Sequence, residues 1–99
     1  MGKYVFIYYA DQNGDDGSAQ DWGTWFGKLG DKIVDPGNPF NEGGKAAHQG
    51  GVMDVQGPRA TGYSIVSASS MDEALALTKD CPLLKSADGA VCVYEALPL

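Results

Sequence analysis

The segment from residue 60 to residue 97 has the hydrophobic pattern of a strand, a helix and a second strand. Residues 62–68 are rich in Tyr, Ile and Val and alternate large with small side chains, which is typical of a strand. Ser70 and Glu73 form an S-x-x-E capping box, and the apolar positions that follow recur at i, i+3, i+4 and i+7. We therefore expect a helix that begins after Ser70 and that Pro82 stops, because proline has no amide hydrogen to donate.

Two strands are predicted to be apolar on both faces. Residues 3–9 alternate two sets of large apolar side chains, and residues 90–97 alternate Val and Leu with Cys and Tyr. A strand of this kind is usually covered on both sides. The two sets within the first strand are Tyr4, Phe6 and Tyr8 on one face and Val5, Ile7 and Tyr9 on the other.

An amphipathic helix is predicted after the first strand. Ser18 is placed to cap it, and its apolar stripe consists of Trp22, Trp25, Phe26, Leu29 and Ile33. Glycine recurs beside this stripe at positions 23, 27 and 30, although a glycine costs about 1 kcal/mol relative to alanine in a helix interior. Either a ligand, a strand or a partner subunit approaches the helix closely there, or the aromatic face simply tolerates weak helix formers.

Glycine and proline punctuate residues 35–61, so this stretch has room only for short strands. We interpret residues 45–48 and 52–55 as a hairpin closed at residues 49–51. Polar residues on such loops often carry binding or catalysis. Histidine titrates nearest to neutral pH, so His48 is the candidate acid or base, and an Asp54 facing it across the hairpin would orient it. The polar candidates are Asp35, Asn38, Lys45, His48, Asp54 and Arg59.

The composition indicates one globular domain and argues against nucleic-acid and membrane partners. The chain has 99 residues, of which 43% are hydrophobic, and this suits one globular domain spanning residues 1–99. Its net charge is −6 with only 7 Lys and Arg, so a nucleic-acid partner is not expected. The sequence has no apolar run long enough to cross a bilayer and no secretory leader, so we expect a cytoplasmic protein without a membrane partner.

Metal and cofactor chemistry is not expected from the residue pattern. Residues 11–22 begin like a calcium loop, but they lack the glycine at the sixth position and the glutamate at the twelfth. Cys81, Cys92 and His48 do not have the spacing of a zinc site. Both cysteines fall at periodic apolar positions and are expected to pack in the core as small hydrophobes. Whether they form a disulfide depends on geometry.

The predicted elements follow the order strand, helix, hairpin, strand, helix, strand. This order matches the split βαβ, ferredoxin-like arrangement, an α+β fold in which two helices cover one face of an antiparallel sheet. The other face would be exposed, although residues 3–9 and 90–97 are apolar on both sides. We therefore predict a homodimer in which the uncovered faces of two sheets pack together about a twofold axis.

Five blocks of sequence stand in a particular order, namely KYVFIYY at 3–9, WGTWFGKLGDKIVDPGNP at 22–39, GVMDVQGP at 51–58, TGYSIVSASSMDEALALTKDCPLL at 61–84 and AVCVYEALP at 90–98. In these blocks and their spacing, the chain resembles the YCII-related proteins, which include the group named for a DGPF motif. The resemblance covers essentially the whole chain. It implies a bacterial, cytoplasmic, dimeric α+β barrel of ferredoxin-like subunits, with a cleft between helix, sheet and loop.

Two departures from the family pattern limit what the resemblance carries over. Some members of the wider group are proposed to use a His and Asp dyad with the histidine on the first helix, whereas the helix predicted here has Trp22 and Trp25 and no histidine. Of the DGPF motif, only Asp54, Gly57 and Pro58 match. The resemblance therefore implies the shape of that loop but not its chemistry.

Two functions remain open at this point. The first is a small-molecule binding or regulatory homodimer, in which a cleft holds a polar ligand that Asp54 and Arg59 orient. The second is a cofactor-independent enzyme of lyase, isomerase or monooxygenase type, with His48 or Asp54 as acid or base and Arg59 steadying an anion. We favour the binding module. The residues predicted to contact its ligand are Tyr8, Trp22, Trp25, Asn38, Phe40, Arg59 and Tyr63.

Overall fold

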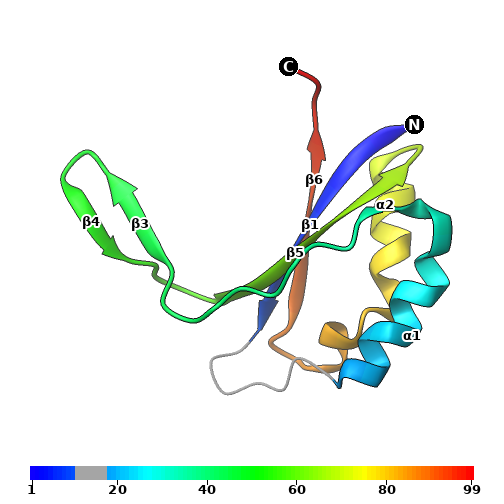
Figure 1. Cartoon of the computed structure of the whole chain (residues 1–99), viewed down its shortest axis with the longest axis horizontal. Coiled ribbons are helices and arrows are strands. Elements are labelled where there is room, and N and C mark those ends of the chain that lie inside the picture. The colour runs from blue at the N-terminus through cyan, green and yellow to red at the C-terminus, as the bar shows by residue number, and fades with distance from the viewer. Residues whose placement is uncertain (11–17) are drawn as a thin grey trace.

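The protein is described by a computed structural model, which places residues 1–10 and 18–99. Within these residues the fold is α+β: a four-stranded antiparallel sheet carries two helices, and a separate hairpin projects from it (Figure 1). The strands are β1 (Gly2–Ala10), β2 (Ile33–Asp35), β3 (Lys45–His48), β4 (Gly51–Asp54), β5 (Arg59–Ala68) and β6 (Ala90–Ala96). The helices are α1 (Ala19–Leu29) and α2 (Met71–Leu77), accompanied by 3-10 turns at Gly30–Lys32, Thr78–Asp80 and Pro82–Lys85.

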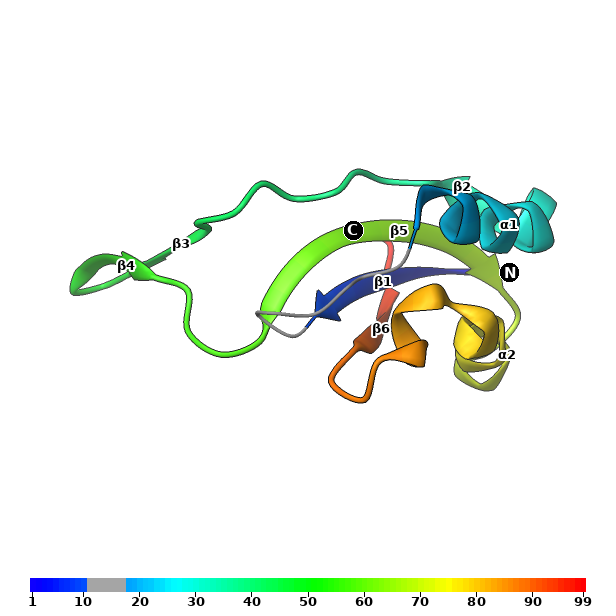
Figure 2. The ribbon, with the colours of Figure 1, turned by 90° about the horizontal axis from the view of Figure 1, so that it is seen from below.

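The main sheet has the strand order β2-β5-β1-β6, and each neighbouring pair is antiparallel. β1 is a central strand: it pairs with β5 from Gly2 opposite Ala68 to Ala10 opposite Arg59, and with β6 along its other edge. Both helices lie on the same side of this sheet (Figure 1 and Figure 2). The arrangement is compatible with the predicted ferredoxin-like fold.

The predicted hairpin forms, but it does not belong to the main sheet. Among the described residues β3 and β4 pair only with each other, and both views show them projecting away from the sheet and the helices (Figure 1 and Figure 2). The strand beside β5 is instead β2, which has three residues. The sequence pattern misses this strand because Ile33 continues the helical stripe. In the structure α1 ends at Leu29, where Gly30 takes a φ of +56°.

The sequence predicts both helix starts correctly. Ser18 Oγ accepts a hydrogen bond from Asp21 N at 3.1 Å, and Ser70 Oγ accepts one from Glu73 N at 3.1 Å. The end of α2 differs from the prediction, because the helix is over before Pro82 is reached. Pro82 opens the last 3-10 turn, a position where the missing amide hydrogen costs little.

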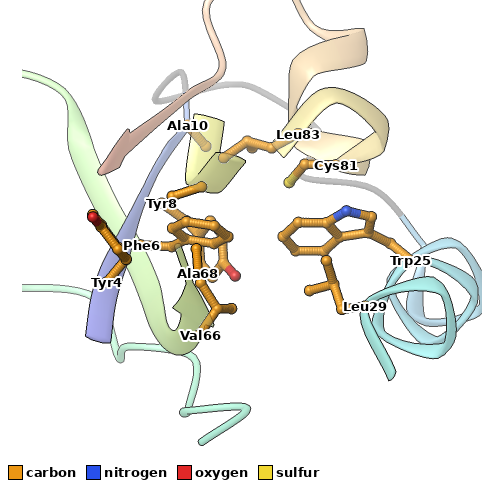
Figure 3. Packing of buried hydrophobic residues seen from close by; sticks show 11 residues of the cluster. Tyr4, Phe6, Tyr8, Ala10, Trp25, Leu29, Val66, Ala68, Cys81 and Leu83 are labelled. Atoms are coloured by element: carbon orange, nitrogen blue, oxygen red, sulfur yellow. The ribbon is translucent and has the colours of Figure 1, made fainter. Parts of the chain in front are cut away.

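The core lies between the sheet and the two helices (Figure 3). Trp25 of α1 is 2% exposed, and its ring centroid lies 6.2 Å from that of Phe6 on β1. The Trp25 indole Nε1 donates to the Leu77 carbonyl oxygen at 3.1 Å, which ties α1 to the end of α2. Cys81 is buried in the same core as a free thiol, and burial raises its pKa to about 11.

The two helices leave the opposite face of the sheet uncovered. Val5 and Ile7 share this face with Ile65 and Cys92, because paired residues on antiparallel strands point to the same side. These four side chains are half-buried, and Tyr94 on the same face is 59% exposed. The prediction that Cys92 packs in the core is therefore wrong for the single chain. Cys92 does alternate with apolar residues along β6, but this spacing does not show which face of the strand the helices cover.

Candidate functional site

A pocket of about 550 Å³ lies between α1, β5 and the segment that follows β2. Small-molecule sites usually have volumes of about 300–1,000 Å³, so this pocket is large enough for a ligand. The lining is mostly apolar.

One wall of the pocket is a stripe along α1. Ala19, Trp22, Gly23 and Phe26 line it, and their i, i+3, i+4, i+7 spacing places them on one side of the helix. The Trp22 ring packs edge-on against Tyr8 with centroids 4.9 Å apart, and it lies tilted against Phe26 at 5.9 Å. Gly23 leaves space on this wall, since a Cβ there would meet no heavy atom within 4 Å beyond its adjacent residues and its own helix backbone.

The second wall is the segment 36–39, which runs along the edge of β5. Phe40 N donates to the Thr61 carbonyl oxygen at 2.7 Å, and Tyr63 N donates to the Asn38 carbonyl oxygen at 3.3 Å. These bonds continue the edge of the sheet beyond β2. The wall is therefore attached to the scaffold by backbone hydrogen bonds rather than by side chains alone.

Two glycines permit this close approach of backbone to backbone. Gly37 has a φ of +78°, and a Cβ there would lie 1.7 Å from the Tyr63 carbonyl oxygen. A Cβ on Gly62 would lie 2.9 Å from the Asn38 carbonyl oxygen. Asp35 Oδ1 accepts a hydrogen bond from Gly37 N at 2.8 Å and fixes the turn. Backbone geometry thus sets this wall.

Tyr8 reaches the pocket from β1, and its hydroxyl is engaged within the protein. It donates to Ser64 Oγ at 2.7 Å, and Ser64 Oγ in turn donates to the Pro36 carbonyl oxygen at 2.6 Å. Burial raises the pKa of the Tyr8 hydroxyl well above its ordinary value. The hydroxyl therefore stays protonated and links β1, β5 and the second wall, which is a structural role.

Four of the seven residues predicted to contact a ligand line the pocket, namely Tyr8, Trp22, Asn38 and Tyr63. Trp25 lies in the core instead. Phe40 is outside the lining, although its ring stacks on that of Tyr63 with centroids 5.9 Å apart. Arg59 begins β5 opposite Ala10 and is also outside the lining.

His48 and Asp54 do not form the pair predicted across the hairpin. The register places His48 opposite Gly51 and Asp54 opposite Lys45, and this puts the two side chains on opposite faces of the hairpin. Asp54 forms an ion pair with Lys45, and His48 Nδ1 accepts a hydrogen bond from Gly50 N at 3.1 Å. Both side chains are exposed and lie outside the pocket. The expectation failed because alternation along a hairpin does not fix its register.

The lining residues that the sequence did not single out as ligand contacts are mostly small. Gly23 was detectable, since a glycine inside an amphipathic helix calls for a reason. The prolines and glycine of segment 36–39 indicate a turn, but nothing in them shows that the segment would lie along β5. The other two glycines of this pattern do not line the pocket. Gly27 is exposed on α1, and Gly30 is the residue at which α1 ends.

A second hollow of about 290 Å³ lies between α1 and the 3-10 turns after α2. Four of its charged side chains form two ion pairs: Lys28 lies 3.8 Å from Asp80, and Lys85 lies 3.8 Å from Asp21. Exposed pairs of this kind contribute little and are screened by salt. The hollow is therefore a crevice beside two surface ion pairs and a weaker candidate than the first pocket.

Residues 1–10 and 18–99 contain no group of three or more His, Cys, Asp or Glu side chains arranged to hold a metal ion. Their helices are too short or too polar to cross a membrane. Segment 11–17, where the comparison with a calcium loop begins, lies outside the described residues. Compared with protein-family models, with curated proteins and with solved structures, the chain matches none of them.

Proposed function

We propose that this protein is a small-molecule binding module that works as a homodimer in the cytoplasm. One observation carries the proposal: backbone contacts fix one wall of the pocket, segment 36–39, against β5. Gly37 and Gly62 allow its wall to lie against β5, and hydrogen bonds between backbone groups keep it there. A ligand would meet a site that is already ordered, which favours binding.

The alternative of an enzyme has less support. Its proposed acid or base residues, His48 and Asp54, stand on the projecting hairpin and point to opposite faces of it. The hydroxyl of Tyr8, which does line the pocket, is engaged with Ser64. Binding without a chemical step therefore accounts for the pocket with the fewest further assumptions.

The proposed dimer forms by packing the uncovered faces of two sheets. This face carries half-buried and exposed apolar side chains, and an apolar patch left in water is unusual for a monomer. The result would be the dimeric α+β barrel implied by the resemblance to the YCII-related proteins. Cys81 and Cys92 are free thiols, which suits a reducing compartment such as the cytoplasm.

Nitrogen–proton correlation NMR spectra test the binding function directly. The labelled protein is titrated with a library of small acids, amines and uncharged aromatic compounds. We expect at least one compound to shift the amide signals of Gly23, Gly37 and Gly62 together, while the amides of β3 and β4 stay in place. The binding proposal is refuted if no compound in the library shifts these three signals.

Sedimentation equilibrium tests the dimer separately. We expect a mass about twice that of the 10.4 kDa chain, as for most closed homo-oligomers. The variant Ile7→Asp places a charge on the shared face and should give a folded monomer. The matched control Val52→Asp places the same charge on the hairpin, where the valine is already 70% exposed, and should remain dimeric. A monomeric wild-type protein would contradict the proposed assembly.

A further inference from the structure

We infer that the pocket selects an uncharged, flat aromatic molecule and that Gly23 sets how large this molecule can be. This inference rests on the proposed binding function and names the class of ligand. It follows from three features of the lining: its charge, its rings and the gap on α1.

The first feature is charge. Of the described residues that line the pocket, none has a charged side chain. Asp35 precedes the lining segment, and its carboxylate accepts the hydrogen bond from Gly37 N. Burying a charged group without a counter-charge is strongly unfavourable, and the attraction of a cation to ring faces is the weaker effect. The net charge of −6 further opposes an anion.

The second feature is the shape of the apolar surface. Trp22 and Phe26 supply rings from α1, and Pro36 and Pro39 supply rings from the facing segment. Tyr8 also lines the pocket, with its ring edge-on to Trp22 at 76°. Ring surfaces pack well against flat aromatic partners in stacked or edge-to-face arrangements. An aromatic ring system is therefore the chemistry that matches this lining.

The third feature is the gap at Gly23. This residue lies in the pocket stripe of α1 between Ala19 and Phe26, and a Cβ there would meet no heavy atom within 4 Å beyond its adjacent residues and its own helix backbone. A larger side chain at position 23 would therefore project into the space that a ligand would fill. Gly27 lies one turn further along α1 and is equally unhindered, but it is outside the pocket lining. The two glycines thus form a matched pair of positions.

The charge selection is tested with three compounds that share one ring system: naphthylmethanol, naphthoate and naphthylmethylammonium. Each is titrated into the full chain, and the shift of the Gly62 amide signal gives its dissociation constant. We expect naphthylmethanol to bind at least about tenfold more tightly than either charged compound. Equal or tighter binding of a charged compound overturns the inference, and so does the absence of binding by all three when another library compound binds. Either of these two outcomes leaves the proposed binding function intact. The binding function itself fails only if no compound of the library binds.

The size selection is tested with Gly23→Leu and Gly27→Leu. Leucine is a better helix former than glycine, so both variants should fold with undiminished thermal stability, which circular dichroism verifies. Gly23→Leu should weaken naphthylmethanol binding by at least about tenfold, because the leucine occupies the space of the ligand. Gly27→Leu should bind like the wild type. The inference is overturned if the two variants bind equally well.

Discussion

Replacing Gly37 by alanine should detach the second wall of the pocket from β5. In the left-handed backbone region an L-residue costs about 1–2 kcal/mol more than glycine. The new Cβ would also lie 1.7 Å from the Tyr63 carbonyl oxygen, a distance that no side-chain movement can relieve. The segment would have to move away from β5. This movement breaks two hydrogen bonds, from Phe40 N to the Thr61 carbonyl oxygen and from Tyr63 N to the Asn38 carbonyl oxygen. At about 1 kcal/mol for each bond, the expected total loss is about 3–4 kcal/mol.

Gly43→Ala is the matched control for this substitution. Gly43 has a φ of +82°, close to that of Gly37, but a Cβ there would meet no heavy atom within 4 Å. It should therefore lose only the backbone cost of about 1–2 kcal/mol. Urea unfolding followed by tryptophan fluorescence measures both losses, and titration with naphthylmethanol reports whether the pocket survives. Equal losses of stability in the two variants, or an intact pocket in Gly37→Ala, would refute the reasoning.

Three further predictions concern groups outside the pocket wall. A hydrogen bond from Ser69 Oγ lowers the pKa of Glu73, and nearby Lys32 lowers it to a smaller extent. The ionised Glu73 therefore stabilises the fold fully above the ordinary glutamate pKa, and this stabilisation is lost as the pH falls through the lowered pKa. The melting temperature of Glu73→Gln should thus lie below the wild-type value at neutral pH and approach it in acid; a gap that persists in acid would contradict this. Burial raises the pKa of the Cys81 thiol to about 11, so Cys81 should resist alkylation, whereas Cys92 should react in the monomeric variant Ile7→Asp. Mass spectrometry measures both reactions, and faster alkylation of Cys81 would show that the assignment of faces is wrong. His48→Ala should leave ligand binding unchanged within error, and a clear loss would restore a role for the hairpin.

The elements that the sequence predicts well are those with local causes. Ser18 and Ser70 cap their helices because a hydroxyl can satisfy an amide three residues later, and that distance is written in the sequence. The alternation in β1 also follows from sequence, since Tyr4, Phe6 and Tyr8 are all buried on one face.

The parts that the sequence does not predict depend on contacts between distant segments. β2 has only three residues, so its identity as a strand comes from its pairing with β5 and not from a periodic pattern. The faces of the hairpin on which His48 and Asp54 lie depend on the strand register that a two-residue turn sets. A shift of this register by one residue changes which side chains share a face. The pocket arises where the backbone of Gly37 meets that of β5, a long-range contact with no local signature.

The most direct test of the central claim is the set of intermolecular NOEs in the complex with naphthylmethanol. The ring protons of the ligand should show contacts with the Trp22 indole, the Phe26 ring and the α protons of Gly23, because these groups line the pocket. Contacts with the hairpin of β3 and β4 or with the uncovered face of the sheet, and none with these three residues, would contradict it.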